Sequence, residues 1–338
     1  MSNLTNVDAF SFLQWSALES SYYDKLFYNL GFCKIGELES NRDVVWKSND
    51  IYFFVTVRRN DFEFRHGPGV CGIGLNFGNA DMAYKHAVSN GMQADNDWGN
   101  VQNVMGPSVG HGIDGVKLYF TDFTVRKELE KSVKRYDNTK EIVTGINKID
   151  HITHNCHQGN VDVWAENYKN WFGMYQNKYF DIDGKETGLT SRAMMSSISS
   201  MAIPLNEDKS NDGQIAKFIH NFNGEGVQHI ALETNDIYFT VERLRSQGIQ
   251  FLNTPDTYYD MISERINEHN EDVNALRELG ILIDGSKEEG ILLQIFTKES
   301  VGPVFFEIIQ RKGNTGFGHG NFQALFEAIE REQLKDRR

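Results

Sequence analysis

The sequence predicts an α+β protein of two open-barrel domains, built from four copies of a βαβββ module. One observation is an internal repeat: residues 69–91, GVCGIGLNFGNADMAYKHAVSNG, align without a gap on residues 226–248, GVQHIALETNDIYFTVERLRSQG. Each copy has the pattern of an apolar strand, a turn, an amphipathic helix and a glycine at the helix end. The other is length, because 338 residues are enough for two ordinary domains, each with its own core.

Two further segments show the same order of strand, loop, helix and glycine. One opens the chain at residue 7, and the other starts near residue 149, with a helix from about Val161 that ends before Gly173. The four modules therefore start near residues 7, 69, 149 and 226. β-branched and aromatic runs between Gly, Asn and Asp turns supply the remaining strands, at residues 44–59, 115–123, 189–205, 290–297 and 304–310.

Two modules per domain would close a curved sheet around a central cavity, with the helices outside. We place the boundary in the polar stretch at residues 137–146. This gives an N-terminal domain, residues 1–143, with a structural or oligomerisation role, and a C-terminal catalytic domain, residues 144–338. Within the second domain, residues 257–279 predict an inserted helix, and residues 321–334 predict a last helix after a Gly-rich stretch.

Composition narrows the class of protein. A hydrophobic fraction of 40% with 23 Phe indicates globular domains with aromatic cores, and a formal net charge of −13 argues against nucleic-acid or anionic-membrane partners. The three cysteines have no metal-binding spacing and predict buried, reduced thiols. Neither a secretory signal nor a run of about 18 apolar residues is present, so we expect a cytoplasmic protein.

Three potential metal ligands lie in strand-like segments: His151 in KIDHITH, His229 in GVQHIAL and Glu307 in PVFFEIIQ, each 78 residues from the next. Two neutral imidazoles and one carboxylate, with coordination positions left open, form the facial triad of mononuclear non-haem iron(II) oxygenases. Zn(II) could take the same ligands, because ligand type alone does not separate the two metals. The trio predicts a metal centre and, with iron, an oxygen-activating enzyme.

The repeat strengthens this prediction. A single histidine on an apolar strand is more often a hydrogen-bonded core residue than a ligand. Here, however, Gly72 aligns with His229, and Ala9 or Phe10 stands where His151 would be. The N-terminal domain therefore lacks the ligands, and any metal belongs to the C-terminal domain.

Strand alternation supports Glu307 and removes competing histidines. Residues on both sides of Glu307 are apolar, and a buried carboxylate needs a charge or a metal as its partner. His154 lies three residues after His151, so it should face the opposite way. His157 and His220 lie in polar surroundings and should be solvated.

Neutral amides and hydroxyls accompany the trio: Ser191, Asn206, Gln214, Gln228 and Gln294. Gln228 would face away from His229 on an ideal strand, so it is either a structural amide that braces neighbouring strands or a site residue. Gln294, Asn206 and Gln214 suit a polar ring substituent. The aromatic residues that could wall a site for an aromatic ligand, or equally fill the core, are Phe296, Phe305, Phe317 and Phe322.

The C-terminal domain closely resembles the 4-hydroxyphenylpyruvate dioxygenase family, whose members have two domains of the vicinal oxygen chelate fold. The resemblance is carried by IDHITHN, GLTSRA, IPLNE, GEGVQHIAL, PDTYY, LLQIFT, VFFEIIQRKGN and GFGHGNFQALFEAIE. It covers about residues 146–334 and is weaker in the N-terminal domain, where HGPGV carries it. One departure is the DGQ at residues 212–214, where the family has a Ser-Gln pair.

The resemblance implies roles for the residues already singled out. His151, His229 and Glu307 would hold one Fe(II) per subunit. Ser191, Asn206 and Gln214 would orient the phenol ring of the substrate, and Gln228 and Gln294 would position its chelating end or brace the ligands. The phenylalanines at 296, 305, 317 and 322 would form the walls, the last two from a C-terminal segment that covers the site.

The implied reaction converts 4-hydroxyphenylpyruvate and O₂ to homogentisate and CO₂, in the catabolism of tyrosine and phenylalanine. The substrate carries its own 2-oxo acid, so 2-oxoglutarate is not expected. Three alternatives stay open: a hydroxymandelate synthase, an extradiol dioxygenase, and a non-enzymatic small-molecule binder of the same fold. The resemblance also implies a homodimer or homotetramer.

Overall fold

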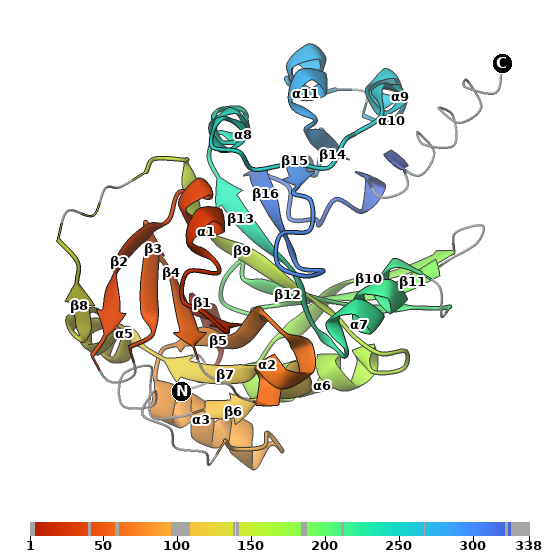
Figure 1. The fold of residues 1–338 in the computed structure, drawn as a ribbon. Coiled ribbons are helices and arrows are strands. Elements are labelled where there is room, and N and C mark those ends of the chain that lie inside the picture. The colour runs from red at the N-terminus through yellow and green to blue at the C-terminus, as the bar shows by residue number, and fades with distance from the viewer. Residues whose placement is uncertain are drawn as a thin grey trace.

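The structure, a computed structural model, describes residues 4–39, 42–57, 61–95, 109–137, 139, 142–183, 188–210, 213–266, 268–321 and 324–325. Within these residues the chain forms two eight-stranded sheets, drawn side by side in Figure 1. The order of strands in the first sheet is β6-β7-β5-β1-β4-β3-β2-β8, and in the second it is β10-β11-β12-β9-β13-β16-β15-β14.

The first sheet uses the N-terminal part of the chain. Its strands are β1 (Val7–Ala17), β2 (Cys33–Leu38), β3 (Val44–Ser48), β4 (Ile51–Val57), β5 (Gly69–Phe77), β6 (Val109–His111), β7 (Lys117–Thr121) and β8 (Val133–Arg135). The accompanying helices are α1 (Asp24–Asn29), α2 (Asp61–His66), α3 (Ala80–Ser89), the short η2 (Ile113–Gly115) and α5 (Phe123–Lys131).

The second sheet begins after the expected boundary at residues 143 and 144. Its strands are β9 (Ile146–Asn155), β10 (Tyr175–Asp183), β11 (Gly188–Met195), β12 (Ala202–Asp208), β13 (Gly226–Thr234), β14 (Leu282–Ser286), β15 (Gly290–Phe296) and β16 (Phe305–Lys312). The accompanying helices are α6 (Val161–Phe172), α7 (Gln214–Phe222), α8 (Ile237–Ser246), α9 (Asp256–Asp260), α10 (Ile262–Arg265) and α11 (Val273–Leu279).

The predicted fold class is confirmed. Each half of the chain gives two modules of one strand, a helix and three further strands, starting at β1, β5, β9 and β13. In each sheet the first strands of the two modules pair antiparallel at the centre, β1 with β5 and β9 with β13. One departure is β8, which crosses to the far edge of the first sheet and pairs with β2.

The repeated segments use the same signals to start and stop a helix. The side chain of Asn79 accepts a hydrogen bond from the backbone of Met82 at the start of α3, and Asp236 does the same for Phe239 at the start of α8. Just beyond the two helix ends, Gly91 and Gly248 both have a φ of 95°, a backbone conformation that glycine adopts without strain. The repeat in sequence is therefore a repeat in structure.

The inserted helix predicted at residues 257–279 is wrong in its continuity. The structure has three short helices there, α9, α10 and α11. Ile266 is extended and ends α10, while the Asp272 side chain caps the backbone of Asn274 and Ala275 and starts α11. Of the predicted last helix, residue 321 and residues 324–325 are helical, and the others lie outside the described residues.

A continuous hydrophobic core joins the two sheets. Trp15 of β1 stacks on Phe306 of β16, with ring centroids 6.0 Å apart, and both are fully buried. Helices α3 and α6 also pack together where the two halves meet. The three cysteines are buried and free, as predicted. None of the helices in the described part of the chain combines the length and the apolar character that crossing a membrane requires.

Candidate metal centre

The structure brings the three predicted ligands together on neighbouring strands β9, β13 and β16. Their ligand atoms all lie within 4.8 Å of one another, and no other group of this kind is found among the described residues. Glu307 Oε2 is 3.2 Å from His151 Nε2 and 3.4 Å from His229 Nε2. The strand register places both His151 and Glu307 opposite Ala231, whose small side chain leaves room between them.

Each histidine is held from behind, through its other ring nitrogen. His151 Nδ1 donates to Asp150 Oδ1 at 2.7 Å, and His229 Nδ1 donates to Gln228 Oε1 at 2.9 Å. Both bonds leave Nε2 facing the centre, which is the arrangement that orients imidazole ligands in metal sites. Thr153 lies opposite His229 in the register, and its hydroxyl is 3.0 Å from the same Nε2, a contact that a bound metal would replace.

One β-bulge at Gln228 and another at Asp150 allow each side chain to contact the histidine that follows it in the chain. The register between β9 and β13 shifts between Val227 and His229, and shifts again at Asp150. An extra residue in a strand turns its side chain away from regular alternation. The expectation that Gln228 faces away from His229 is therefore wrong, because it assumed an ideal strand.

Asp150 and Arg311 form a buried ion pair behind His151 that the sequence interpretation missed. Arg311 donates from Nε and Nη2 to the two oxygens of Asp150, both at 2.7 Å. It also donates to the backbone oxygens of Asn314 and Gly316, so it ties the loop after β16 to the metal centre. The Asp-His pair in IDHITH was the only local signal, since Arg311 lies 161 residues further on.

The charges at the centre are set by these neighbours. Burial alone would lower the pKa of His151, but Glu307 and Asp150 raise it to about 9. Burial lowers the pKa of His229, which keeps that ring neutral. Burial would raise the pKa of Glu307, yet the two histidines lower it to about 2, and Arg311 with His151 brings the pKa of Asp150 well below its usual range.

This donor set fits a divalent metal ion. Two ligand atoms each about 2.1 Å from one ion, at right angles to each other, are about 3 Å apart, close to the separations between Glu307 and the two histidines. The second oxygen of Glu307 is occupied elsewhere, because Gln294 Nε2 donates to Oε1 at 3.2 Å. Glu307 thus offers a single oxygen, and with two nitrogens the trio leaves coordination positions open.

The first sheet shows what replaces the ligands when no metal is held. In the first sheet, Gly74 pairs with Phe12 on one neighbouring strand and with Tyr119 on the other. In the second sheet, Ala231 pairs in the same way with His151 and with Glu307. The counterpart of His151 is therefore Phe12, not Ala9 or Phe10, because the gapless alignment took no account of the bulges in β1. The rings of Phe12 and Tyr119 lie 5.4 Å apart and fill the position of the metal centre.

Three of the four predicted aromatic residues lie beside the two histidines of the trio. Phe305 stacks on His229 with ring centroids 5.0 Å apart, and Phe296 lies 6.2 Å from the same ring. Phe317 meets His151 edge-on at 5.2 Å, and the Arg311 guanidinium lies over the Phe317 ring, 5.4 Å from its centroid. Phe322 lies outside the described residues.

Two of the predicted polar residues, Gln228 and Gln294, contact the ligands directly. Gln294 accepts from Asn321 Nδ2 at 3.0 Å, and Asn321 in turn accepts from the Tyr258 hydroxyl at 2.6 Å. Neither Asn321 nor Tyr258 was singled out from the sequence. Ser191 and Asn206 are half-buried and face each other across β11 and β12. Gln214 is exposed at the first turn of α7, away from these contacts.

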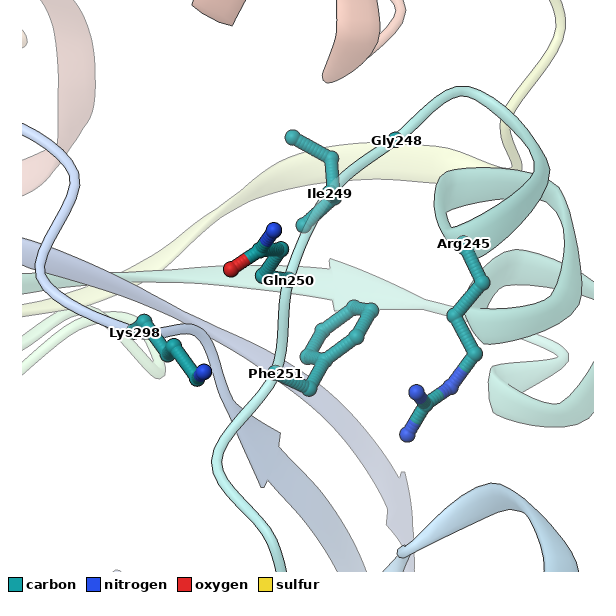
Figure 2. Close-up of a pocket in the computed structure, with 6 residues that line it drawn as sticks. All are labelled: Arg245, Gly248, Ile249, Gln250, Phe251 and Lys298. Atoms are coloured by element: carbon teal, nitrogen blue, oxygen red, sulfur yellow. The ribbon is translucent and has the colours of Figure 1, made fainter.

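The competing histidines behave as expected. His154 is fully buried on the face opposite His151, where its Nδ1 bonds to the Tyr168 hydroxyl of α6, and His157 and His220 are exposed. A separate open hollow of about 410 Å³ lies beyond the end of α8 (Figure 2). None of the residues of the metal centre line this hollow. Its lining residues are Arg245, Gly248, Ile249, Gln250, Phe251 and Lys298.

Paired sheets of βαβββ modules, with two histidines and a glutamate on one sheet, define a protein of the vicinal oxygen chelate class. Sequence comparison agrees. Residues 1–138 match the family described as hydroxyphenylpyruvate dioxygenase, N-terminal, and residues 148–264 match the glyoxalase, bleomycin resistance protein and dioxygenase superfamily.

Individual relatives define the family more narrowly. The chain is 41% identical to a 4-hydroxyphenylpyruvate dioxygenase of Legionella pneumophila, over 98% of this chain and 97% of the relative. It is 42% identical to hemolysin VllY of Vibrio vulnificus, over the same shares of both chains. The chain belongs to the 4-hydroxyphenylpyruvate dioxygenase family and is an enzyme of that family. A mutant of 4-hydroxymandelate synthase from Streptomyces coelicolor shares the fold, with a TM-score of 0.78, 23% identity and coverage of 97% and 99% of the two chains.

Proposed function

We propose that the protein is an Fe(II)-dependent dioxygenase that converts 4-hydroxyphenylpyruvate and O₂ to homogentisate and CO₂, in the breakdown of tyrosine and phenylalanine. The observation that carries the proposal is the convergence of His151, His229 and Glu307 within 4.8 Å, in a chain of this family. The reaction balances without another substrate, because the 2-oxo acid of the substrate supplies the two electrons that O₂ needs beyond those from the ring. Neither 2-oxoglutarate nor a separate reductant is required.

The three ligands would hold one Fe(II), which when bound supplies the site for O₂ and for the two oxygens of the 2-oxo acid. The protein's own part is orientation. Asp150 and Gln228 hold the histidine rings, and Gln294 keeps one oxygen of Glu307 away from the metal position. The main role of Gln294 and Gln228 would thus be to orient the metal ligands. They would also contact the chelating end of the substrate.

The aromatic ring of the substrate would lie against Phe296, Phe305 and Phe317, which exclude water from the centre. Ser191 and Asn206 would contact the ring hydroxyl. We assign no part to Gln214, because its side chain is exposed. The first domain, which has Phe12 and Tyr119 at the corresponding positions, would serve a structural role and the assembly of a homodimer or homotetramer.

The test is to load the purified protein with Fe(II), add 4-hydroxyphenylpyruvate, follow O₂ uptake and identify the product by chromatography. Homogentisate supports the proposal. Hydroxymandelate would instead assign the protein to the related synthase, whose fold the chain shares. Iron-loaded protein without substrate-dependent O₂ uptake would contradict both.

A variant ties the activity to the proposed ligands. We expect His151→Ala to bind no Fe(II) and to show no turnover, while keeping the fold by circular dichroism. His154→Ala is the matched control, because this histidine is on the same strand and faces α6. Iron and activity retained in His151→Ala would refute the ligand assignment.

A further inference from the structure

Asn155 is a buried amide for which the described part of the chain offers no hydrogen-bond partner. It is the last residue of β9 and is fully buried, and neither Nδ2 nor Oδ1 has a hydrogen bond among the described residues. Burying an amide without a partner destabilises a protein, so an amide with both polar atoms unpaired calls for an explanation. Asn321, another buried amide, has both of its side-chain atoms paired.

The Asn155 side chain points to the face of the sheet that carries the metal centre. β9 has no register shift between His151 and Asn155, so side chains at 151, 153 and 155 share one face. His154, between them, contacts Tyr168 of α6 on the opposite face. The metal ligand and the unpaired amide therefore look into the same side of the sheet, about 13 Å apart along the strand.

Neighbouring strands continue a row of polar side chains from Asn155. The register pairs Asn155 with Asn206 of β12, Asn206 with Ser191 of β11, and Ser191 with Phe180 of β10. Side chains of directly paired residues lie on one face. On the other side of Asn155 the register places Gly226, which has no side chain to cover the amide.

Two contacts show that this row lies on the side of the sheet that carries the metal centre. The Phe180 ring stacks on His319 at 4.2 Å, and His319 belongs to the segment whose Phe317 packs on His151. Arg192, next to Ser191, reaches the opposite face and pairs with Asp162 of α6. The row from Ser191 to Asn155 is therefore a polar row on the same face of the sheet as the trio.

We propose that Asn155 is a specificity-determining residue, which recognises the para-hydroxyl group of an aryl 2-oxo acid together with Ser191 and Asn206. This inference rests on the proposed function. A substrate held at the metal by its 2-oxo acid end would extend its ring towards this polar row. A phenol hydroxyl both donates and accepts, and an amide offers one donor and one acceptor to match it.

The test compares 4-hydroxyphenylpyruvate with phenylpyruvate, which lacks the hydroxyl group, in Asn155→Leu. Leucine is close in volume and apolar. We expect the preference for the hydroxylated substrate, as a ratio of kcat/KM, to fall roughly 10-fold or more. The same preference is measured as dissociation constants with protein loaded with Zn(II), which does not turn over.

The melting temperature gives an independent test, because a structural role for Asn155 predicts the opposite change in it. The metal-free Asn155→Leu protein should melt at the same temperature as wild type or higher, because an unpaired buried amide is removed. Asn314→Leu is the control: Asn314 is buried, but its amide pairs with Gly290 and Gly316, so its loss should lower the melting temperature.

A lower melting temperature in Asn155→Leu with an unchanged substrate ratio would overturn the proposal and make Asn155 structural. Asn155→Ala, which introduces no steric conflict, gives the same ratio measurement should the leucine variant fail to fold. If wild type turns over neither substrate, the proposed function fails, whereas turnover by wild type with unaltered ratios in both variants rejects the role of Asn155 alone.

Discussion

Asp150 shows how much one side chain outside the ligand set contributes. Its carboxylate accepts from His151 on one side and from Arg311 on the other, and it is nearly inaccessible to solvent. The ligands themselves could be predicted from the repeat and from the cost of burying Glu307. The Asp150–Arg311 pair could not, because it joins residues far apart in the chain and depends on a bulge that the sequence does not signal.

Asp150→Asn should weaken metal binding about 10- to 100-fold, since an amide no longer fixes the Nδ1 proton of His151 as a carboxylate does. It should also lower the free energy of unfolding by about 3–5 kcal/mol, because Arg311 is left as a buried charge without its partner. Metal titration and urea denaturation measure the two effects. Unchanged metal affinity would show that Asp150 does not orient His151.

Metal binding should release close to one proton at pH 7.5. In the metal-free protein the pKa of His151 is about 9, so its ring is protonated, while the lowered pKa of His229 leaves that ring neutral. A ligand must be neutral, so the affinity should rise about tenfold per pH unit up to about pH 9 and then level off. Calorimetry in two buffers of different ionisation enthalpy counts the protons, and a value of zero or two would contradict the assignment.

The same pKa has a consequence for the metal-free fold. Because the folded pKa of His151 is raised from 6.5 to about 9, its contribution to stability is full below pH 6.5 and is lost as the pH rises to 9. Glu307 works in the opposite direction: its pKa falls from 4.5 to about 2, so its contribution is lost as the pH falls through that interval.

At the scale of elements, strand and helix types followed from periodicity, but their interruptions did not. The helix predicted over residues 257–279 breaks at Ile266 and restarts at the Asp272 cap, a choice that apolar spacing does not encode. The orientation of Gln228 could not be predicted for a similar reason. The bulge that changes it arises from the pairing of β13 with β9 and not from the sequence of one strand. The prediction for Gln214 depended on the family resemblance, at a place where this sequence departs from the motif of the family. In the structure the Gln214 side chain is exposed.

The segment after β16 is held to the metal centre by a directional chain of hydrogen bonds. Tyr258 donates to Asn321, Asn321 to Gln294, and Gln294 to Glu307. The approach is close at Gly318, which has a φ of 70° and where an added Cβ would meet the Gln294 side chain. The segment that brings Phe317 to His151 is thus tied to the carboxylate ligand.

Tyr258→Phe should loosen this segment while keeping the ring in the core. We expect the free energy of unfolding to fall by about 1–3 kcal/mol, and hydrogen exchange to quicken at residues 314–321. Tyr168→Phe is the control, because it removes another buried hydroxyl bond, to His154, far from that segment in the chain. Equal exchange at residues 314–321 in the two variants would show that Tyr258 does not hold the segment.

Across the whole molecule, the duplication predicted the architecture, but the docking of the two sheets had no signal in the sequence. Trp15 and Phe306 lie 291 residues apart and belong to one continuous buried cluster. His66, in the HGPGV segment, stacks on Phe222 at 4.7 Å and contacts its backbone oxygen through Nδ1. The N-terminal half of the family resemblance thus coincides with a contact to the second half of the molecule.

A shared core predicts that the two halves unfold together. Urea denaturation followed by tryptophan fluorescence and by circular dichroism should give coincident curves, because neither sheet can keep its buried face without the other. Phe306→Ala should lower the free energy of this single transition by about 3–5 kcal/mol without splitting it. Phe64→Ala makes the same chemical change at a side chain that is 90% exposed, and should alter stability by no more than about 0.5 kcal/mol. Two separated transitions in wild type would mean that the domains are independently stable, and the stack of Trp15 on Phe306 would then be a contact between finished folds.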